Sequence, residues 1–152
     1  MFETRPAFYR KRMSYYLGID AGGSQTTCAV GDGQLVLGRA RGGACKLSKV
    51  GDKQAREVLQ SVIQECCGAG GIKPSDIAHT CIGVAGISGL KVTESMCTIL
   101  ASVVGGEIQV TGDMTIALEA AFGESPGVIV IAGTGSIAFG RKIGRASCRE
   151  RV

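Results

Sequence analysis

Apolar residues between positions 15 and 41 alternate with polar or small ones in short runs, a pattern typical of β-strands. Glycine-containing turns separate the runs. Gly22-Gly23 follows the first run, and Asp32-Gly33, a strong hairpin signal, follows the second. The pattern therefore predicts three antiparallel strands joined by tight turns, at residues 15–20, 26–31 and 34–41.

After these strands, the spacing between apolar residues increases to that of an amphipathic helix. Over residues 51–67, apolar side chains recur every three or four positions. The glycines between Gly68 and Gly71 end this pattern, and Pro74 prevents its resumption. The apolar positions of the predicted helix are Ala55, Val58, Leu59, Val62, Ile63 and Cys66.

In the rest of the chain, segments with the apolar pattern of a strand alternate with segments that have the apolar spacing of a helix. The order of elements predicts an α/β fold, in which a mixed sheet that begins with three antiparallel strands is covered by flanking helices. The segment 123–127 indicates a boundary, so we expect one lobe at residues 13–123 and the beginning of a second lobe at 127–141. The remaining predicted strands are 77–84, 108–111, 128–131 and 136–140, and the remaining helices are 92–104 and 114–122.

The first turn carries candidate chemistry. Asp20 ends the first strand, the glycines Gly22 and Gly23 form the turn, and the hydroxyls of Ser24 and Thr26 follow. Glycines, expected here with positive φ, leave backbone amides open to phosphate oxygens. The Asp20 carboxylate is an oxygen ligand of the kind that Mg²⁺ prefers. An ordinary Gly-Gly hairpin is the alternative, and the hydroxyls also suit a plain strand.

A second turn repeats this arrangement. The apolar strand at 128–131 leads into a turn of small and hydroxyl residues, and another strand follows. Between the two turns, Val110-Thr111-Gly112 leads into Asp113, a further aspartate at a strand end. Two turns of this kind with an aspartate between them are more specific than a single glycine-rich loop. The second turn consists of Gly133, Thr134, Gly135 and Ser136.

These three ordered motifs resemble those of the sugar kinase, actin and heat-shock ATPase superfamily. Within it, the chain looks most like the BadF/BadG/BcrA/BcrD-type ATPases, which include N-acetylglucosamine and glucosamine kinases. The resemblance covers about residues 14–141. It implies a ribonuclease H-like (actin-like ATPase) lobe, ATP and Mg²⁺ as cofactors, and phosphorylation of N-acetylglucosamine, glucosamine or a related hexose. It also implies a cytoplasmic enzyme whose whole form is a candidate homodimer.

The resemblance implies roles for individual residues. Asp113 is expected to be the general base that accepts the proton of the sugar hydroxyl. An N-cap of the helix at 114–122 is its structural alternative, and both roles are compatible. Asp20 is expected to hold Mg²⁺ directly or through water. The phosphates are expected to meet the two turns at Gly22, Gly23, Ser24, Thr26, Gly133, Thr134, Gly135 and Ser136.

One loop departs from the family pattern. Many amino-sugar kinases carry an asparagine near the sugar after the third strand, where this chain has Gly43-Ala44-Cys45-Lys46. An ammonium in place of an amide removes an acceptor and adds charge. Lys46 is therefore expected either to meet an anionic or differently substituted substrate or to be solvated. The loop at 85–89 is expected to touch substrate or to be a plain strand-to-helix connection.

Two other functions belong to different classes. Another branch of the family consists of ATPase activators of 2-hydroxyacyl-CoA dehydratase or benzoyl-CoA reductase systems, which hold an iron–sulfur cluster between subunits. The strand-Gly-Asp unit at 110–113 favours the kinase over this alternative. The third hypothesis is a non-catalytic actin-like or regulatory module. Related regulators carry a helix-turn-helix, which the first twelve residues are too few to form.

The two ends of the chain lie outside the pattern. Residues 1–12 are interpreted as a misplaced start, with a disordered arm as the alternative. Residues 142–152 are similar to a translated sequencing adapter, with a natural basic tail as the alternative. In the superfamily the nucleotide lies between two lobes, so the 152-residue chain is expected to be inactive by itself.

Charge and cysteine content exclude several other classes. Residues 13–141 hold 9 basic and 11 acidic residues, so the net charge of +4 comes from the ends and does not support nucleic-acid binding. The seven cysteines form no Cys-x-x-Cys pair and are expected to be small buried residues. No apolar run reaches 18 residues, so no membrane span is expected. His79 is expected at a surface or strand end, and Glu119 in solvent or a salt bridge.

Overall fold

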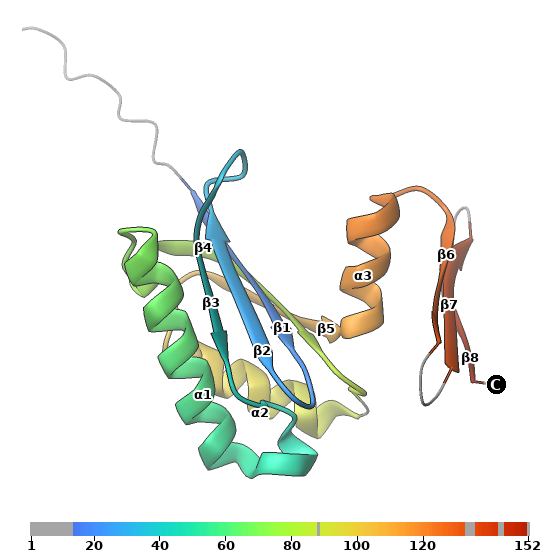
Figure 1. Cartoon of the computed structure of the whole chain (residues 1–152), viewed down its shortest axis with the longest axis horizontal. Coiled ribbons are helices and arrows are strands. Elements are labelled where there is room, and N and C mark those ends of the chain that lie inside the picture. The colour runs from blue at the N-terminus through green and yellow to red at the C-terminus, as the bar shows by residue number, and fades with distance from the viewer. Residues whose placement is uncertain (1–13, 88, 133–135, 143–144, 152) are drawn as a thin grey trace, which may run out of the picture.

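The computed structural model describes residues 14–87, 89–132, 136–142 and 145–151, with side chains for residues 14–87, 89–131 and 137–142. The described residues form a five-stranded mixed sheet with flanking helices, followed by a three-stranded antiparallel sheet (Figure 1). This arrangement confirms the predicted α/β class and the mixed sheet.

The strand order in the first sheet is β3-β2-β1-β4-β5. The first three strands are antiparallel neighbours, whereas β4 runs parallel to β1 and β5 runs parallel to β4. The predicted hairpin order is therefore confirmed. The strands are β1 (Tyr15–Ala21), β2 (Thr26–Gly31), β3 (Val36–Gly42), β4 (Ile77–Val84) and β5 (Glu107–Gly112).

The turn between β2 and β3 is longer than predicted. The Asp32 Oδ1 atom accepts hydrogen bonds from the backbone N–H groups of Gln34 and Leu35, both at 2.9 Å. Such a side-chain turn competes with the strand ladder, and Gly33 supplies the positive φ of 88° that the turn requires. For this reason β3 begins at Val36 rather than at residue 34.

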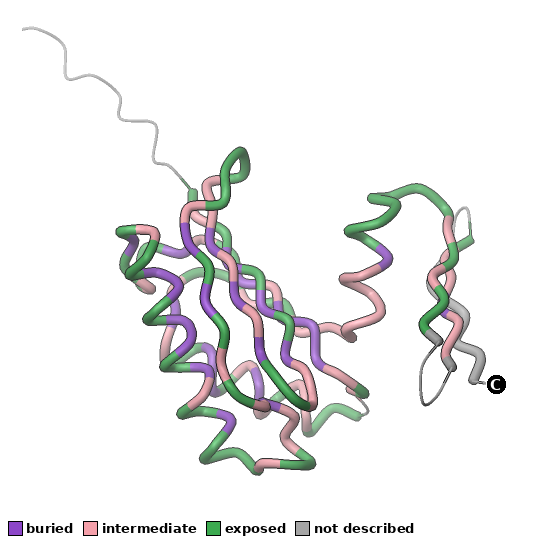
Figure 2. Tube along the Cα trace, in the orientation of Figure 1, coloured by how far each residue is buried: buried purple, intermediate pink, exposed green. Residues whose placement is uncertain are grey.

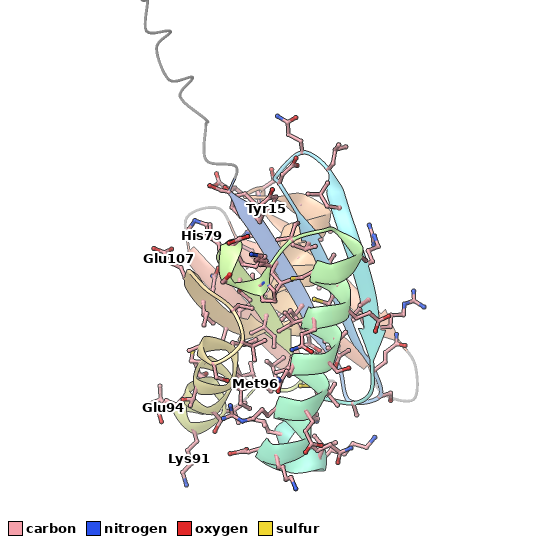
Figure 3. The ribbon with its side chains drawn as sticks, turned by 90° about the vertical axis from the view of Figure 1, so that its left-hand side faces the viewer. Tyr15, His79, Lys91, Glu94, Met96 and Glu107 are labelled. Carbon is pink, nitrogen blue, oxygen red and sulfur yellow. The ribbon has the colours of Figure 1, made fainter. Side chains whose placement is uncertain are left out.

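Three α-helices flank the sheet. The first, α1 (Leu47–Ala69), begins before the predicted start and contains a break at Gly51, where φ is 76°. The second, α2 (Leu90–Ala101), ends three residues before the predicted end, and both helices lie on one face of the sheet (Figure 3). The third, α3 (Asp113–Phe122), follows β5 directly, and a short 3₁₀ turn, η1 (Pro74–Asp76), precedes β4.

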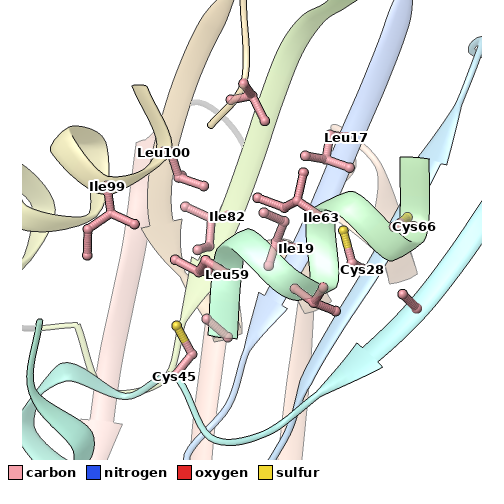
Figure 4. Close-up of a cluster of buried hydrophobic side chains, with 14 of the residues drawn as sticks. Leu17, Ile19, Cys28, Cys45, Leu59, Ile63, Cys66, Ile82, Ile99 and Leu100 are labelled. Atoms are coloured by element: carbon pink, nitrogen blue, oxygen red, sulfur yellow. The ribbon is translucent and has the colours of Figure 1, made fainter. Parts of the chain in front are cut away.

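The main core lies between the sheet and the first two helices (Figures 2 and 4). Leu17 and Ile19 on β1 pack with Leu59 and Ile63 of α1, and all four side chains are buried. Burial of such side chains is the main favourable contribution to folding. The cysteines Cys28, Cys45, Cys66 and Cys67 are buried here as predicted, and burial raises the pKa of each thiol.

The opposite face of the sheet carries His79. Its ring stacks on Tyr16 with centroids 5.6 Å apart, and its Nδ1 atom lies 3.1 Å from Oε2 of Glu107. Figure 3 shows His79 and Glu107 on neighbouring strands. The predicted surface position is confirmed, but the histidine has two partners that the sequence did not indicate.

The second sheet contains one strand that the sequence did not predict. Its members are β6 (Gly127–Ala132), β7 (Ser136–Lys142) and β8 (Arg145–Arg151). The residues of β8 lack an apolar alternation, and the strand is defined by its antiparallel backbone pairing with β7. No helix in the described part of the chain has the length and apolarity of a membrane span.

Close packing of α1 on β3 leads to a stability prediction. A Cβ atom on Gly38 would overlap the Cys66 carbonyl oxygen and would lie 2.9 Å from the amide nitrogen of Gly70. Gly38→Ala is therefore expected to lower the free energy of unfolding by about 1–3 kcal/mol, as overpacking does. Urea denaturation of the chain measures this change.

Gly68→Ala is the matched control for that substitution. No atom lies within 4 Å of the Cβ that it would add to α1, so the change is expected to stabilise the chain by about 0.5–1 kcal/mol through helix propensity. Equal effects of the two substitutions would contradict the close packing of α1 on β3.

Candidate active site

Three strand ends meet at one edge of the first sheet. Because β1, β4 and β5 are parallel, Asp20 pairs with Gly83 and Val84 pairs with Gly112. The next residue, Asp113, is the first residue of α3. Figure 1 shows α3 directly after β5. Both aspartates therefore lie at the carboxyl edge of the strands, where ligands of α/β sheets bind.

The absence of a side chain at Gly83 allows α3 to start close to the sheet. A Cβ atom on Gly83 would overlap the end of the Ile116 side chain and would lie 3.3 Å from the Cα atom of Asp113. Paired residues of parallel strands point to the same face, so Asp20 and Gly83 both face α3. Asp113 is consequently placed near Asp20, on the face opposite α1 and α2.

The surroundings of Asp20 disfavour its negative charge. Partial burial raises the pKa of Asp20 above its ordinary value, and the negative charge of Asp113 raises it further. The Asp113 Oδ1 atom accepts a hydrogen bond from the Met114 N–H at 2.9 Å. The amino end of α3 also favours a negative charge at this position.

The predicted N-cap role of Asp113 is wrong, because Asp113 does not occupy the cap position of α3. The helix begins at Asp113 itself, and the preceding Gly112, with extended backbone, occupies the cap position. Asp113 therefore has helical backbone geometry, and its carboxylate accepts the N–H of the adjacent residue rather than one further along the first turn.

This pair of carboxylates fits a magnesium ion. Mg²⁺ binds through one or two carboxylates and completes its shell with waters and substrate phosphates. A divalent cation would also relieve the repulsion that raises the pKa of Asp20. No group of three or more His, Cys, Asp or Glu side chains with metal-binding geometry occurs among the described residues. Asp20 and Asp113 are thus the carboxylates that this edge of the sheet offers.

The first glycine turn closes between Gly22 and Gln25. The Gly22 N–H donates to the Gln25 carbonyl at 3.0 Å, and a Cβ on Gly22 would lie 2.6 Å from that oxygen. Neither Gly22 nor Gly23 has positive φ, so that expectation is wrong. Glycine is required at position 22 because of a close backbone approach.

The tip of this turn presents unpaired amides. Within the described residues, the N–H groups of Gly23, Ser24 and Gln25 donate to no protein acceptor. Amides without internal acceptors are available to donate hydrogen bonds to an anion. Ser24 is exposed beside them and adds a hydroxyl donor.

Hydrogen bonds connect the first turn and the start of β2 to the segment that follows β3. Thr26 Oγ1 donates to the Gly43 carbonyl at 2.8 Å, and the Cys45 N–H donates to the Gly22 carbonyl at 3.3 Å. Lys49 Nζ donates to the Gly23 carbonyl at 2.8 Å. Thr26 is 0% exposed, so its side chain positions the loop instead of facing a ligand.

Lys46 belongs to the same loop, and its side chain lies beside Gly23 and Gly86. Its Cδ atom would lie 3.9 Å from a Cβ on Gly23, and its Nζ atom would lie 3.4 Å from a Cβ on Gly86. The side chain therefore passes between the first turn and the loop that follows β4. The sequence singled out this lysine only as a departure from the family pattern, which does not reveal its neighbours.

The second turn is described only at its margins. Gly133, Thr134 and Gly135 lie outside the described residues, and Ser136 enters the description as the first backbone position of β7, paired with Ala132. Of the two surroundings expected for Glu119, solvent or a salt bridge, the structure shows a salt bridge, because Arg141 Nη1 on β7 lies 2.7 Å from Glu119 Oε1. Arg141 also donates to the Gly123 and Ser125 carbonyls, so it joins α3 to the second sheet.

The raised pKa of Asp20 leads to a pH-dependence prediction. Because the pKa is higher in the folded chain than in the unfolded one, the stability contributed by Asp20 is present below pH 3.8 and is lost as the pH rises through the folded pKa. Asp20→Asn removes this loss. The variant is therefore expected to gain stability relative to wild type between about pH 3 and about pH 7.

Urea denaturation of the chain at the two pH values measures this difference. Asp52→Asn, which removes an exposed carboxylate of α1, is the control for the change in net charge. The same pH response in both variants would show that Asp20 is not destabilised by its surroundings.

Comparison with known proteins identifies the family of the chain. The model of the BadF/BadG/BcrA/BcrD ATPase family matches residues 17–149. An N-acetylmuramic acid/N-acetylglucosamine kinase from Clostridium acetobutylicum is 34% identical over an alignment of 140 residues, which covers 89% of this chain and 45% of that protein.

Solved structures show the same fold. A candidate N-acetylglucosamine kinase from Porphyromonas gingivalis has a TM-score of 0.71 at 26% identity, over 88% of this chain and 46% of its own. A second candidate N-acetylglucosamine kinase, from Chromobacterium violaceum, has a TM-score of 0.70 at 24% identity, over 91% of this chain and 48% of its own.

The chain spans about half the length of these relatives. Over that length it has the fold of the actin-like ATPases and sugar kinases, with aspartates at the ends of β1 and β5 beside a glycine turn. Because the family model covers most of its residues, the chain belongs to the BadF/BadG/BcrA/BcrD ATPase family.

Proposed function

We propose that this chain forms the part of a cytoplasmic, ATP-dependent sugar kinase that binds the nucleotide phosphates and the sugar hydroxyl. The observation that carries the proposal is the placement of Asp113 near Asp20, at the same sheet edge as the Gly22–Gln25 turn. The proposed substrates are N-acetylglucosamine, glucosamine or N-acetylmuramic acid. The relative from Clostridium acetobutylicum, which is named for two of these sugars, supports this choice.

In this proposal Asp113 is the general base. Its carboxylate accepts the proton of the sugar hydroxyl while that oxygen forms a bond to the γ-phosphorus of ATP and the bond to ADP breaks. The start of α3 against Gly83 fixes the position of the carboxylate. Fixed placement of this kind supplies most of the catalysis in phosphoryl transfer.

The first turn is proposed to hold phosphate oxygens. Its amides at Gly23, Ser24 and Gln25 have no acceptor among the described residues, and the Ser24 hydroxyl lies beside them. The second turn is proposed to act in the same way through Gly133, Thr134, Gly135 and Ser136. Asp20 would hold Mg²⁺, which neutralises phosphate charge when it is bound.

The alternative activator function requires cysteine ligands for an iron–sulfur cluster. In the described part of the chain, Cys28, Cys45, Cys66 and Cys67 are buried within the core, and burial raises the pKa of their thiols. Thiolates are the form that binds metal, so these four cysteines do not favour that function. An iron assay on the anaerobically purified whole protein separates the two functions.

The base assignment is tested by Asp113→Asn in the whole protein. The amide keeps the shape of the side chain but cannot accept the hydroxyl proton, so kcat is expected to fall by at least about 10²-fold. A coupled assay of ADP release with N-acetylglucosamine measures this change. Glu119→Gln on the same helix, where the carboxylate pairs with Arg141, is the matched control. Comparable kcat values for the two variants would remove the base role from Asp113.

The magnesium assignment is tested by Asp20→Ala. Loss of the carboxylate is expected to weaken binding of Mg·ATP more than binding of ATP without metal, because only the first depends on an oxygen ligand for the ion. Isothermal titration of the whole protein with and without Mg²⁺ measures both affinities. Asp76→Ala in η1 controls for the loss of an exposed carboxylate. If Mg·ATP binds the Asp20 variant and the control equally well, the ion is held elsewhere.

A further inference from the structure

Lys46 is half-buried between two loops of the candidate active site. Its aliphatic stem lies beside Gly23 of the first turn, and its ammonium lies over Gly86 of the loop after β4. Gly86 has a φ of 63° and no side chain, which leaves room above the backbone for the ammonium. The lysine thus spans the gap between two loops that follow neighbouring strands.

The charge of Lys46 has no protein partner in the described part of the chain. No carboxylate there lies within 4 Å of its ammonium, and none of the described hydrogen bonds involves it. The neighbouring Lys49 differs, because its ammonium donates to the Gly23 carbonyl at 2.8 Å. A half-buried cation loses part of its hydration, and an anionic partner would restore that interaction.

From this arrangement we propose that the Lys46 ammonium binds an anionic oxygen group of the ligand that occupies the active site. The proposal rests on the kinase function and assigns one contact of its substrates. Lys46 lies beside the first turn, whose amides at Gly23, Ser24 and Gln25 have no acceptor among the described residues. The ammonium and the amides therefore both favour a negatively charged ligand group at this place.

Two sources can supply the anionic oxygens. One is the carboxylate of an acidic amino sugar. N-acetylmuramic acid carries a lactyl ether with a carboxylate, and N-acetylglucosamine lacks it. The other source is a phosphate of ATP. The ammonium would form the same charge-assisted hydrogen bond with either group, and the two sources differ in which ligand depends on Lys46.

The experiment measures binding by isothermal titration of the whole protein with N-acetylmuramic acid, N-acetylglucosamine and Mg·ATP. Lys46→Met keeps the aliphatic stem and removes the charge, whereas Lys46→Arg keeps a charge and donors. Lys53→Met, at an exposed position of α1, controls for the loss of one positive charge. Lys46→Met is expected to raise the Kd of the anionic ligand by about 10-fold, and Lys46→Arg is expected to restore most of the affinity.

The pattern of affinities identifies the source of the anion. A selective loss for N-acetylmuramic acid relative to N-acetylglucosamine assigns the carboxylate, and a selective loss for Mg·ATP assigns the phosphate. Either result supports the proposal. If Lys46→Met weakens neither ligand more than Lys53→Met does, or if the wild type binds neither anionic ligand, the proposal is overturned.

A parallel assay of phosphate transfer keeps the two proposals separate. Binding that depends on Lys46 without any transfer to a sugar would contradict the kinase function and leave the anion contact in place. Transfer to a sugar in wild type, with affinities that do not depend on Lys46, would retain the kinase function and remove the role of Lys46.

Discussion

The site depends on the parallel pairing of β1, β4 and β5. This pairing brings three strand ends to one edge, and the missing side chain of Gly83 allows α3 to start against the sheet at that edge. Asp20 and Asp113 are therefore brought together by backbone register. The result is electrostatically unfavourable, because burial and the charge of Asp113 raise the pKa of Asp20. Groups with perturbed pKa values of this kind are typical of functional sites.

The first glycine turn, which follows β1, is held by hydrogen bonds to the loop after β3 and the start of α1. Thr26, Cys45 and Lys49 each contribute a hydrogen bond between the turn and the β3–α1 connection. Cys45 and Lys49 donate to the Gly22 and Gly23 carbonyl groups of the turn, whereas Thr26 donates to the Gly43 carbonyl of the loop, and the amides at the tip of the turn have no acceptor among the described residues. A turn fixed in this way pays little ordering entropy when it binds an anion. The same bonds explain why Thr26 is buried although it lies beside the site.

Much of the fold could be predicted from the sequence, because hydrophobic period and turn residues are local signals. The strands β1, β2 and β4 were predicted in this way, and so was the placement of Asp20 and Asp113 at strand ends. Boundaries were less accurate where side chains compete with the backbone, as Asp32 does before β3. The strand β8 was not predicted, because its residues lack the alternation of apolar and polar side chains that indicates a strand. The neighbours of Lys46 depend on contacts between distant segments, which no local pattern encodes.

The acidic and basic side chains around the site lie on different faces of the sheet. Asp20 and Asp113 lie on the face of the sheet against which α3 starts, and Lys46 and Lys49 come from the start of α1, which packs on the opposite face. The glycine turn lies between them. A ligand that carries both a metal ion and anionic oxygens would be oriented by this separation, because each of its charges is favoured on one side only. In the proposed function, the charge pattern would therefore orient Mg·ATP or an anionic sugar in the site.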